Sequence, residues 1–112
     1  MQPEIKKYLS DMLESARAVQ TFVASSPRPP SLADRLHRSA VYFEFCIIGE
    51  ALTQIRQRSP ELLNRIAEAS RIIGFRNQIA HGYSHLDDAI TWRIITDKLP
   101  VLIKDLETLL AE

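Results

Sequence analysis

The sequence predicts an all-α protein, a single domain of residues 1–112 built as an antiparallel four-helix bundle whose C-terminal helix is kinked or split. Apolar residues recur at steps of three and four along most of the chain, which is the spacing of amphipathic helices. Glycine is scarce, with three in 112 residues, and the prolines stand where helices are expected to begin, end or bend. No segment shows a strand pattern. Long helices with short connections make a bundle.

Two long helices are predicted in the first half of the chain. The first covers residues 3–25, where a proline suits the first turn and an apolar stripe follows at helical spacing. Three prolines within residues 27–30 end this helix, because proline cannot continue one. The second helix covers residues 32–58, with Ser31 as its N-cap and Asp34 as its third residue.

The middle of the second helix is apolar on nearly every side over residues 40–55. Such a helix is expected to be buried by the bundle and, in part, by a second subunit. Glu44 and Glu50 interrupt this stretch, and charges are rarely buried without a partner. Glu50 is therefore expected either to pair with an arginine near the motif described below or to reach the rim of the protein.

A third helix is predicted over residues 60–81. Ser59 provides an N-cap, and a proline and a glutamate follow in the first turn, as is common at helix starts. If this helix is interrupted, the break is expected near Ser70 or Gly74. Its later half carries apolar residues that are expected to pack against the bundle.

The last predicted helix follows a turn over residues 82–86. Asp87 or Asp88 is expected to cap its N-terminus, since aspartate accepts hydrogen bonds from the free N–H groups there. The helix continues to the end of the chain. Pro100 lies inside it and is expected to kink or restart it, because proline lacks a backbone N–H.

Composition and charge exclude several classes of protein. The formal net charge is zero, so contact with RNA would depend on a local basic patch. No apolar run is long enough for a membrane span, and the N-terminus does not read as a signal peptide. The single cysteine, Cys46, can form no internal disulfide and is expected to be a buried structural thiol. These features indicate a cytoplasmic protein with no membrane partner.

One stretch of eight residues, RNQIAHGY, gathers most of the reactive side chains. Asn77 and His81 stand at i and i+4, on the same face of a helix. Gly82 is expected to end the helix, since glycine often follows the last helical residue. Arg76 then lies on the helix, and Tyr83 lies on the turn that leaves it.

The side chains of this stretch suit metal-free cleavage of RNA, in which a base activates a 2′-OH against the adjacent phosphodiester. The imidazole of His81 can accept or donate a proton near neutral pH. The guanidinium of Arg76 can bind phosphate oxygens and stabilise the charge that develops on them, and the Asn77 amide can orient either group. The same residues also fit a structural interpretation. In it, Arg76 and Asn77 are solvated, and the helix dipole favours His81 as a cation at the C-terminus.

These residues resemble a known family, the HepT-like toxins of the HEPN superfamily of helical ribonucleases. Arg76, His81 and Tyr83 match the R-x-x-x-x-H-x-Y signature of that family. Three further segments agree with the family in the same order along the chain: Ile48–Ala51 (IGEA), Ile73–Phe75 (IGF), and Trp92 followed by Asp97–Pro100 (DKLP). The resemblance covers roughly residues 35–110.

The resemblance implies a homodimer in which two copies of the motif face each other across a cleft and form a composite site for an RNA substrate, such as a tRNA or an mRNA. It also implies a second partner, a nucleotidyltransferase antitoxin of the MntA type. That antitoxin neutralises the toxin by AMPylation, the transfer of AMP from ATP onto Tyr83. An attached nucleotide would place bulk and negative charge beside Arg76 and His81, where an RNA phosphate would lie.

The resemblance also implies a role for each motif residue. His81 is the general acid or base, and Arg76 binds the phosphate and stabilises the transition state. Asn77 positions one of these groups or the RNA, and Tyr83 is the modification site. Glu50 matches the IGEA segment and has a supporting role.

No metal ion or cofactor is expected in the chain itself; ATP and magnesium would belong to the antitoxin. The three histidines His37, His81 and His85 show no ligand spacing on one helical face, and the acidic pair at 87–88 is explained as a helix cap. The main alternative function is a non-catalytic helical module whose Arg76/His81 face docks a nucleotidyltransferase, and a plain structural dimer is a third. The intact motif favours the ribonuclease, since a docking face needs no imidazole there.

Overall fold

The structure, a computed structural model, describes residues 1–24 and 34–112, with the backbone alone at Tyr83. The described residues contain helices and turns and no strand, which confirms the all-α class. None of their helices is long and apolar enough to span a membrane. The elements in chain order are α1 (Pro3–Ala24), α2 (Arg35–Arg58), α3 (Pro60–Leu63), α4 (Ala69–His81), the 3₁₀ helix η2 (Tyr83–His85), α5 (Asp88–Arg93), the π-helix η3 (Ile94–Lys98) and α6 (Leu99–Leu110).

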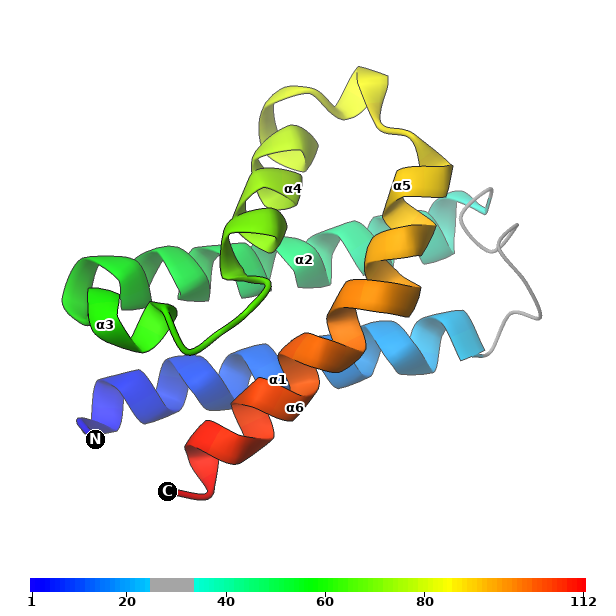
Figure 1. Cartoon of the computed structure of the whole chain (residues 1–112). Helices are drawn as coiled ribbons and strands as arrows, with labels where there is room; N and C mark the ends of the chain where they lie inside the picture. Colours follow the sequence, from blue (N-terminus) through cyan, green and yellow to red (C-terminus); the bar gives the residue numbers. More distant parts are fainter. Residues whose placement is uncertain (25–33) are drawn as a thin grey trace.

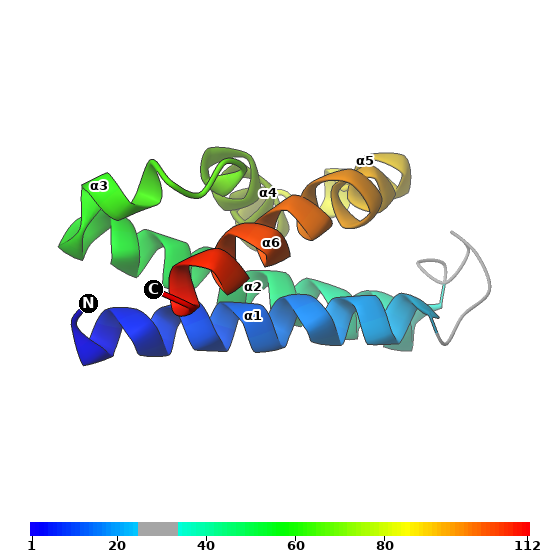
Figure 2. The same ribbon diagram turned by 60° about the horizontal axis from the view of Figure 1, so that its bottom comes forward.

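The helices form two layers. The long helices α1 and α2 run antiparallel and pack along their length as the first layer (Figure 1). The second layer lies across them, with α4 packed on α2 and α6 packed on α1 (Figure 2). The C-terminal end of α4 extends past α2 on the side away from α1, and both chain termini lie near α3 at another part of the molecule (Figure 1).

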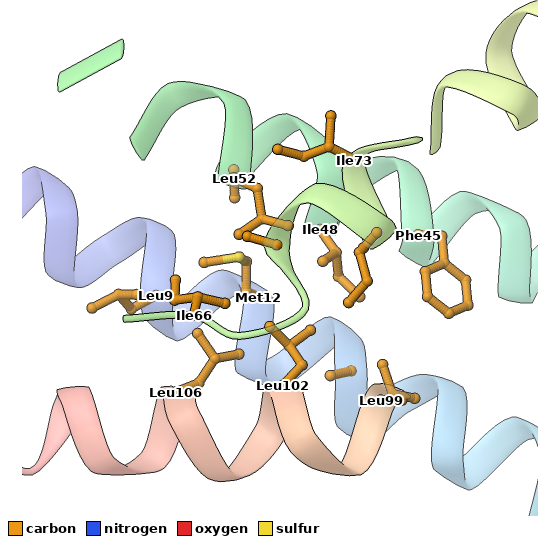
Figure 3. Close-up of a cluster of buried hydrophobic side chains, with 14 of the residues drawn as sticks. Leu9, Met12, Phe45, Ile48, Leu52, Ile66, Ile73, Leu99, Leu102 and Leu106 are labelled. Carbon is orange, nitrogen blue, oxygen red and sulfur yellow. The ribbon is translucent and has the colours of Figure 1, made fainter. Parts of the chain in front are cut away.

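The hydrophobic core fills the space between these layers. Figure 3 shows side chains from both layers meeting there: Leu9, Met12, Phe45, Ile48, Leu52, Ile66, Ile73, Leu99, Leu102 and Leu106. The ring of Phe75 on α4 packs edge-on against Phe45 of α2, with 5.0 Å between the ring centroids. This contact fixes the part of α4 that immediately precedes Arg76 against α2.

The start of α2 differs from the sequence prediction. Ser31, the predicted N-cap, and the prolines at 27–30 lie outside the described residues. Asp34, predicted as the third helical residue, is itself the N-cap, because its extended backbone lets its carboxylate accept from the N–H of Leu36 at 3.0 Å. A 2.6 Å hydrogen bond to His37, together with the Leu36 N–H, lowers the pKa of Asp34 below its usual value.

The helix predicted over residues 60–81 is interrupted, because residues 64–68 form turns between α3 and α4. This break ends just before Ser70, near one of the two places predicted for it, whereas Gly74 lies within α4. A residue of the C-terminal helix α6 stabilises these turns, because the carboxylate of Asp105 accepts a hydrogen bond from the backbone N–H of Ala67 at 2.9 Å. They also bury Ile66, which is 2% exposed, in the core. The change of direction sets α4 across α2.

The C-terminal segment starts at the cap predicted for it. Asp87 is the N-cap of α5, and its carboxylate accepts from the N–H of Ala89 at 2.8 Å. The chain then passes through the wide π-helical turn η3 before α6 begins with Pro100 in its first turn. A proline donates no hydrogen bond to the preceding turn, and a π-helical turn is one way in which a helix accommodates such a gap.

Candidate functional site

The motif lies at the C-terminal end of α4. As predicted, α4 ends at His81, and Gly82 follows as its C-cap with its N–H bonded to the carbonyl oxygen of Gln78 at 2.7 Å. Gly82 has a φ of −137°, so the backbone there is not left-handed. Tyr83 opens the short helix η2, which carries the chain away from α4. The motif therefore spans the last turns of one helix and the turn that follows.

The side chains of Asn77 and His81 are exposed and stand one turn apart on the same face of α4. The side chain of Arg76 points in a different direction, towards α2. On a helix, two residues five positions apart differ by about 140° in direction and about 7.5 Å in height. No hydrogen bond joins the Arg76 and His81 side chains in the described part of the chain. A single copy therefore brings Asn77 and His81 together but does not bring His81 to Arg76.

Arg76 is held between α4 and α2, with 20% of its side chain exposed. The stem of the side chain crosses Gly49 so closely that a Cβ atom added to Gly49 would lie 2.5 Å from Cγ and 2.6 Å from Cβ of Arg76. Real Cβ atoms essentially never approach other atoms below 3.0 Å. The absence of a side chain at Gly49 is therefore what allows Arg76 to lie flat against α2.

The guanidinium of Arg76 makes two contacts with α2. Its Nη2 donates to Oγ1 of Thr53 at 3.1 Å, and its Nη1 lies 3.5 Å from a carboxylate oxygen of Glu50. Its Nε is buried without a hydrogen-bond partner among the described residues. A buried unpaired N–H costs about 1–3 kcal/mol, so this arginine is held at some expense to stability.

Glu50 meets both of the expectations for it. It pairs with Arg76, and it also reaches the rim, since 60% of its side chain is exposed. An exposed ion pair at this separation contributes little, on the order of 0–1 kcal/mol. A phosphate oxygen, which an arginine binds through two parallel hydrogen bonds, could therefore replace the carboxylate of Glu50 at Nη1.

The structure adds to the motif two residues that the sequence did not identify, Gly49 and Thr53. Gly49 belongs to the IGEA segment, and Thr53 belongs to no motif. A glycine in the middle of a helix is less favourable than alanine by about 1 kcal/mol, and this could have pointed to a close approach at Gly49. Nothing in the sequence pattern distinguishes Thr53. Within residues 1–24 and 34–112, no three His, Cys, Asp or Glu residues gather as metal ligands would.

Comparison with known proteins agrees with the motif. A family model described as "Ribonuclease HepT-like" matches residues 12–109. Two similar proteins come from Methanocaldococcus jannaschii. One, named "Putative RNase MJ1380", is 29% identical over 93% of this chain and 94% of its own length. The other, named "Putative RNase MJ0127", is 22% identical over 97% of this chain and 89% of its own length.

No solved structure shows significant similarity to the chain. The family model nevertheless covers all of the core helices α2, α4 and α6 up to residue 109, together with the whole motif. The two relatives extend the similarity over nearly the full length of both sequences. The chain therefore belongs to the HepT-like ribonuclease family.

Proposed function

We propose that this protein is the toxin of a toxin–antitoxin system and acts as a metal-independent endoribonuclease. The observation that carries the proposal is that the last turns of α4 carry both a fixed arginine and an exposed histidine. Arg76 is held by Gly49 and Thr53 with its guanidinium reaching the surface, while His81 stands exposed at the helix end. Family membership supports the same reaction class.

The reaction follows from these two groups. His81 accepts the proton of an RNA 2′-OH, and the 2′-oxygen attacks the adjacent phosphorus. Arg76 stabilises the negative charge that grows on the phosphate oxygens. The bond to the 5′-oxygen breaks, and an imidazolium returns a proton to that oxygen. The products are a 2′,3′-cyclic phosphate and a 5′-hydroxyl. Asn77 shares the face of His81 and orients the imidazole or the RNA.

The end groups of the products test this proposal. The purified protein, incubated with total tRNA or with an mRNA transcript in excess EDTA, is expected to yield fragments with 2′,3′-cyclic phosphate and 5′-hydroxyl ends. The same RNA made with 2′-O-methyl nucleotides is the control and should remain intact, because it lacks the nucleophile. Cleavage that stops with EDTA, or that leaves 5′-phosphates, would contradict the mechanism; a protein that cleaves no RNA would favour the docking module.

A homodimer completes the proposed site. In one copy, His81 and Arg76 point in directions about 140° apart on α4, so a second copy supplies the missing group at each phosphate. The outer face of α2 offers a surface for this contact. Leu36 is 75% exposed and Phe43 is 64% exposed, and these are the most exposed large apolar side chains among the described residues. Phe43 stands two turns before Glu50, the partner of Arg76, on the same face of α2.

Cys46 belongs to the same side of α2. It was expected to be buried, but it is only half-buried, because its position is rotated by about 100° from the core residue Phe45. An interface on this face would bury the apolar side chains that a single copy leaves exposed, which supports the expectation that a second subunit covers α2.

The proposed antitoxin is a nucleotidyltransferase of the MntA type, which supplies ATP and magnesium. In the transfer, the Tyr83 oxygen attacks the α-phosphorus of ATP, pyrophosphate leaves, and the phenolic proton passes to solvent. Tyr83 lies two residues beyond His81, in the turn that follows α4. A nucleotide attached there adds bulk and a negative phosphate next to the groups that bind RNA, which blocks cleavage by both shape and charge.

The intact mass of the protein tests this regulation. Co-expression with a nucleotidyltransferase of the MntA type is expected to add whole AMP units, and Tyr83→Phe should abolish the gain. The other two tyrosines provide matched controls, and Tyr8→Phe and Tyr42→Phe should both retain it. An unchanged mass with an active transferase, or a gain that survives in Tyr83→Phe, would contradict AMPylation at this residue.

A further inference from the structure

We infer that Gly49 and Thr53 are positioning residues that fix the Arg76 guanidinium for phosphate binding. The inference rests on the proposed function of Arg76 and adds two residues to it, neither of which would touch the RNA. Both lie on α2, whereas the motif lies on α4. The geometry of the arginine is thus decided by a helix that carries none of the motif.

Gly49 positions Arg76 because it has no side chain, which leaves space for the arginine against α2. Its φ is not positive, so glycine is not required for the backbone conformation. It is required because Cβ and Cγ of Arg76 occupy the place where a side chain would be. Cβ of Arg76 is fixed by the backbone of α4 and cannot swing aside, and Cγ can move only if the whole side chain rotates. An alanine at position 49 would therefore rotate the Arg76 side chain away or push α4 off α2.

Thr53 acts through the direction of its hydroxyl group. It donates its hydrogen to the carbonyl oxygen of Gly49 at 2.9 Å, which leaves its lone pairs free to accept from Nη2 of Arg76 at 3.1 Å. This two-step connection, from Gly49 O through Thr53 to Arg76, sets the plane of the guanidinium. Nη1 then points towards Glu50 at the rim.

A fixed guanidinium favours binding of a phosphate. A free arginine side chain must give up rotational freedom when it binds, whereas Arg76 has already lost much of this freedom in its contact with α2. Positioned donors also stabilise developing charge better than mobile ones, because they need not reorganise during the reaction. Loss of either positioning residue should therefore reduce catalysis mainly through Arg76.

A double-mutant cycle measures this dependence. Gly49→Ala is expected to lower kcat/KM for RNA cleavage at least 10-fold. Arg76→Ala is expected to cause a severe loss of activity in the wild type but little further loss in the Gly49→Ala background. Gly74→Ala is the matched control: it is also a glycine-to-alanine change, on α4, but an added Cβ meets nothing within 4 Å. That variant should retain full activity. Losses from Gly49→Ala and Arg76→Ala that simply multiply would overturn the inference.

Thr53 gives a second test that does not depend on the folding of Gly49→Ala. Thr53→Val keeps the shape but removes the acceptor, and a 3- to 10-fold loss is expected, with no loss in the Arg76→Ala background. Thr53→Ser keeps the hydroxyl and should restore activity. Thr108→Val removes a threonine hydroxyl that also bonds to the carbonyl four residues earlier, but on α6, and should change nothing. Full activity of Thr53→Val would overturn the role of Thr53.

The side-chain nitrogens of Arg76 separate this inference from the proposed function. In ¹⁵N NMR spectra of the RNA-free protein, the Nη signals of Arg76 are expected to be distinct, because the bond to Thr53 slows rotation about Nε–Cζ. They should merge in Thr53→Val and stay distinct in Thr108→Val. If the wild type cleaves no RNA but shows this pattern, the proposed function fails and the positioning holds. Merged signals in the wild type would overturn the positioning, whatever the activity.

Discussion

Replacing His81 with alanine is expected to lower RNA cleavage by about 10²–10⁴-fold, the range that a well-placed general acid or base contributes. The imidazole is the group in the motif that can exchange a proton near neutral pH. Its side chain is exposed at the end of α4, so its removal should leave the core intact. Single-turnover cleavage rates measured on a folded dimer, verified by circular dichroism and sedimentation, check this prediction.

His85 provides the matched control for this experiment. It is an exposed histidine four residues further along, in η2, and His85→Ala should cleave RNA at the wild-type rate. Growth arrest on expression should follow the same order, with the His85 variant toxic and the His81 variant harmless. Full cleavage by His81→Ala would remove the catalytic role of His81 and leave the docking module as the better explanation.

Phe43→Glu is expected to convert the proposed dimer to a monomer and to abolish the proposed cleavage together with it. In an interface between two identical copies, each change occurs twice. Two phenyl groups, each worth about 1.5–3 kcal/mol when buried, are lost, so the dimer should weaken by at least about 10²-fold, and two introduced charges face each other. Phe43 is 64% exposed in the single copy, so the fold itself should tolerate the change. Analytical ultracentrifugation at micromolar concentration measures the effect.

Val101→Glu is the control for Phe43→Glu. Val101 is an exposed apolar residue, 38% exposed, but it lies on α6 and not on the outer face of α2. Its variant should remain dimeric and active. A Phe43→Glu protein that stays dimeric would place the interface elsewhere, and a monomer that cleaves RNA at the full rate would refute the composite site.

The parts of the structure that follow local rules could be predicted from the sequence. The end of α4 at His81 and the cap at Asp87 both depend on residues within a few positions of the helix terminus. The helical class followed from periodicity alone. An ion pair between Glu50 and an arginine near the motif was one of the two predicted alternatives, because a charge within an apolar stretch needs a partner or water; the structure identifies that arginine as Arg76.

The parts that depend on distant residues could not be predicted. The turns at 64–68 are stabilised by Asp105 and by burial of Ile66, and neither contact leaves a signal in the sequence around them. The contact of Arg76 with α2 is a similar case. Its guanidinium depends on a threonine 23 positions away, and only the packing of α4 on α2 brings the two together. Local chemistry thus located the motif, and tertiary contacts determine its geometry.

The bond from Ala67 to Asp105 has a consequence for the synthesis of this protein. The direction of α4, and so the placement of Arg76 on α2, depends on a carboxylate near the end of the chain. The first helix likewise packs against the last, with Leu9 and Met12 in the same core as Leu102 and Leu106 (Figure 3). A nascent chain that still lacks α6 therefore has neither a closed core nor an oriented motif. During translation, Arg76 is therefore expected to reach its position on α2 only after α6 has left the ribosome.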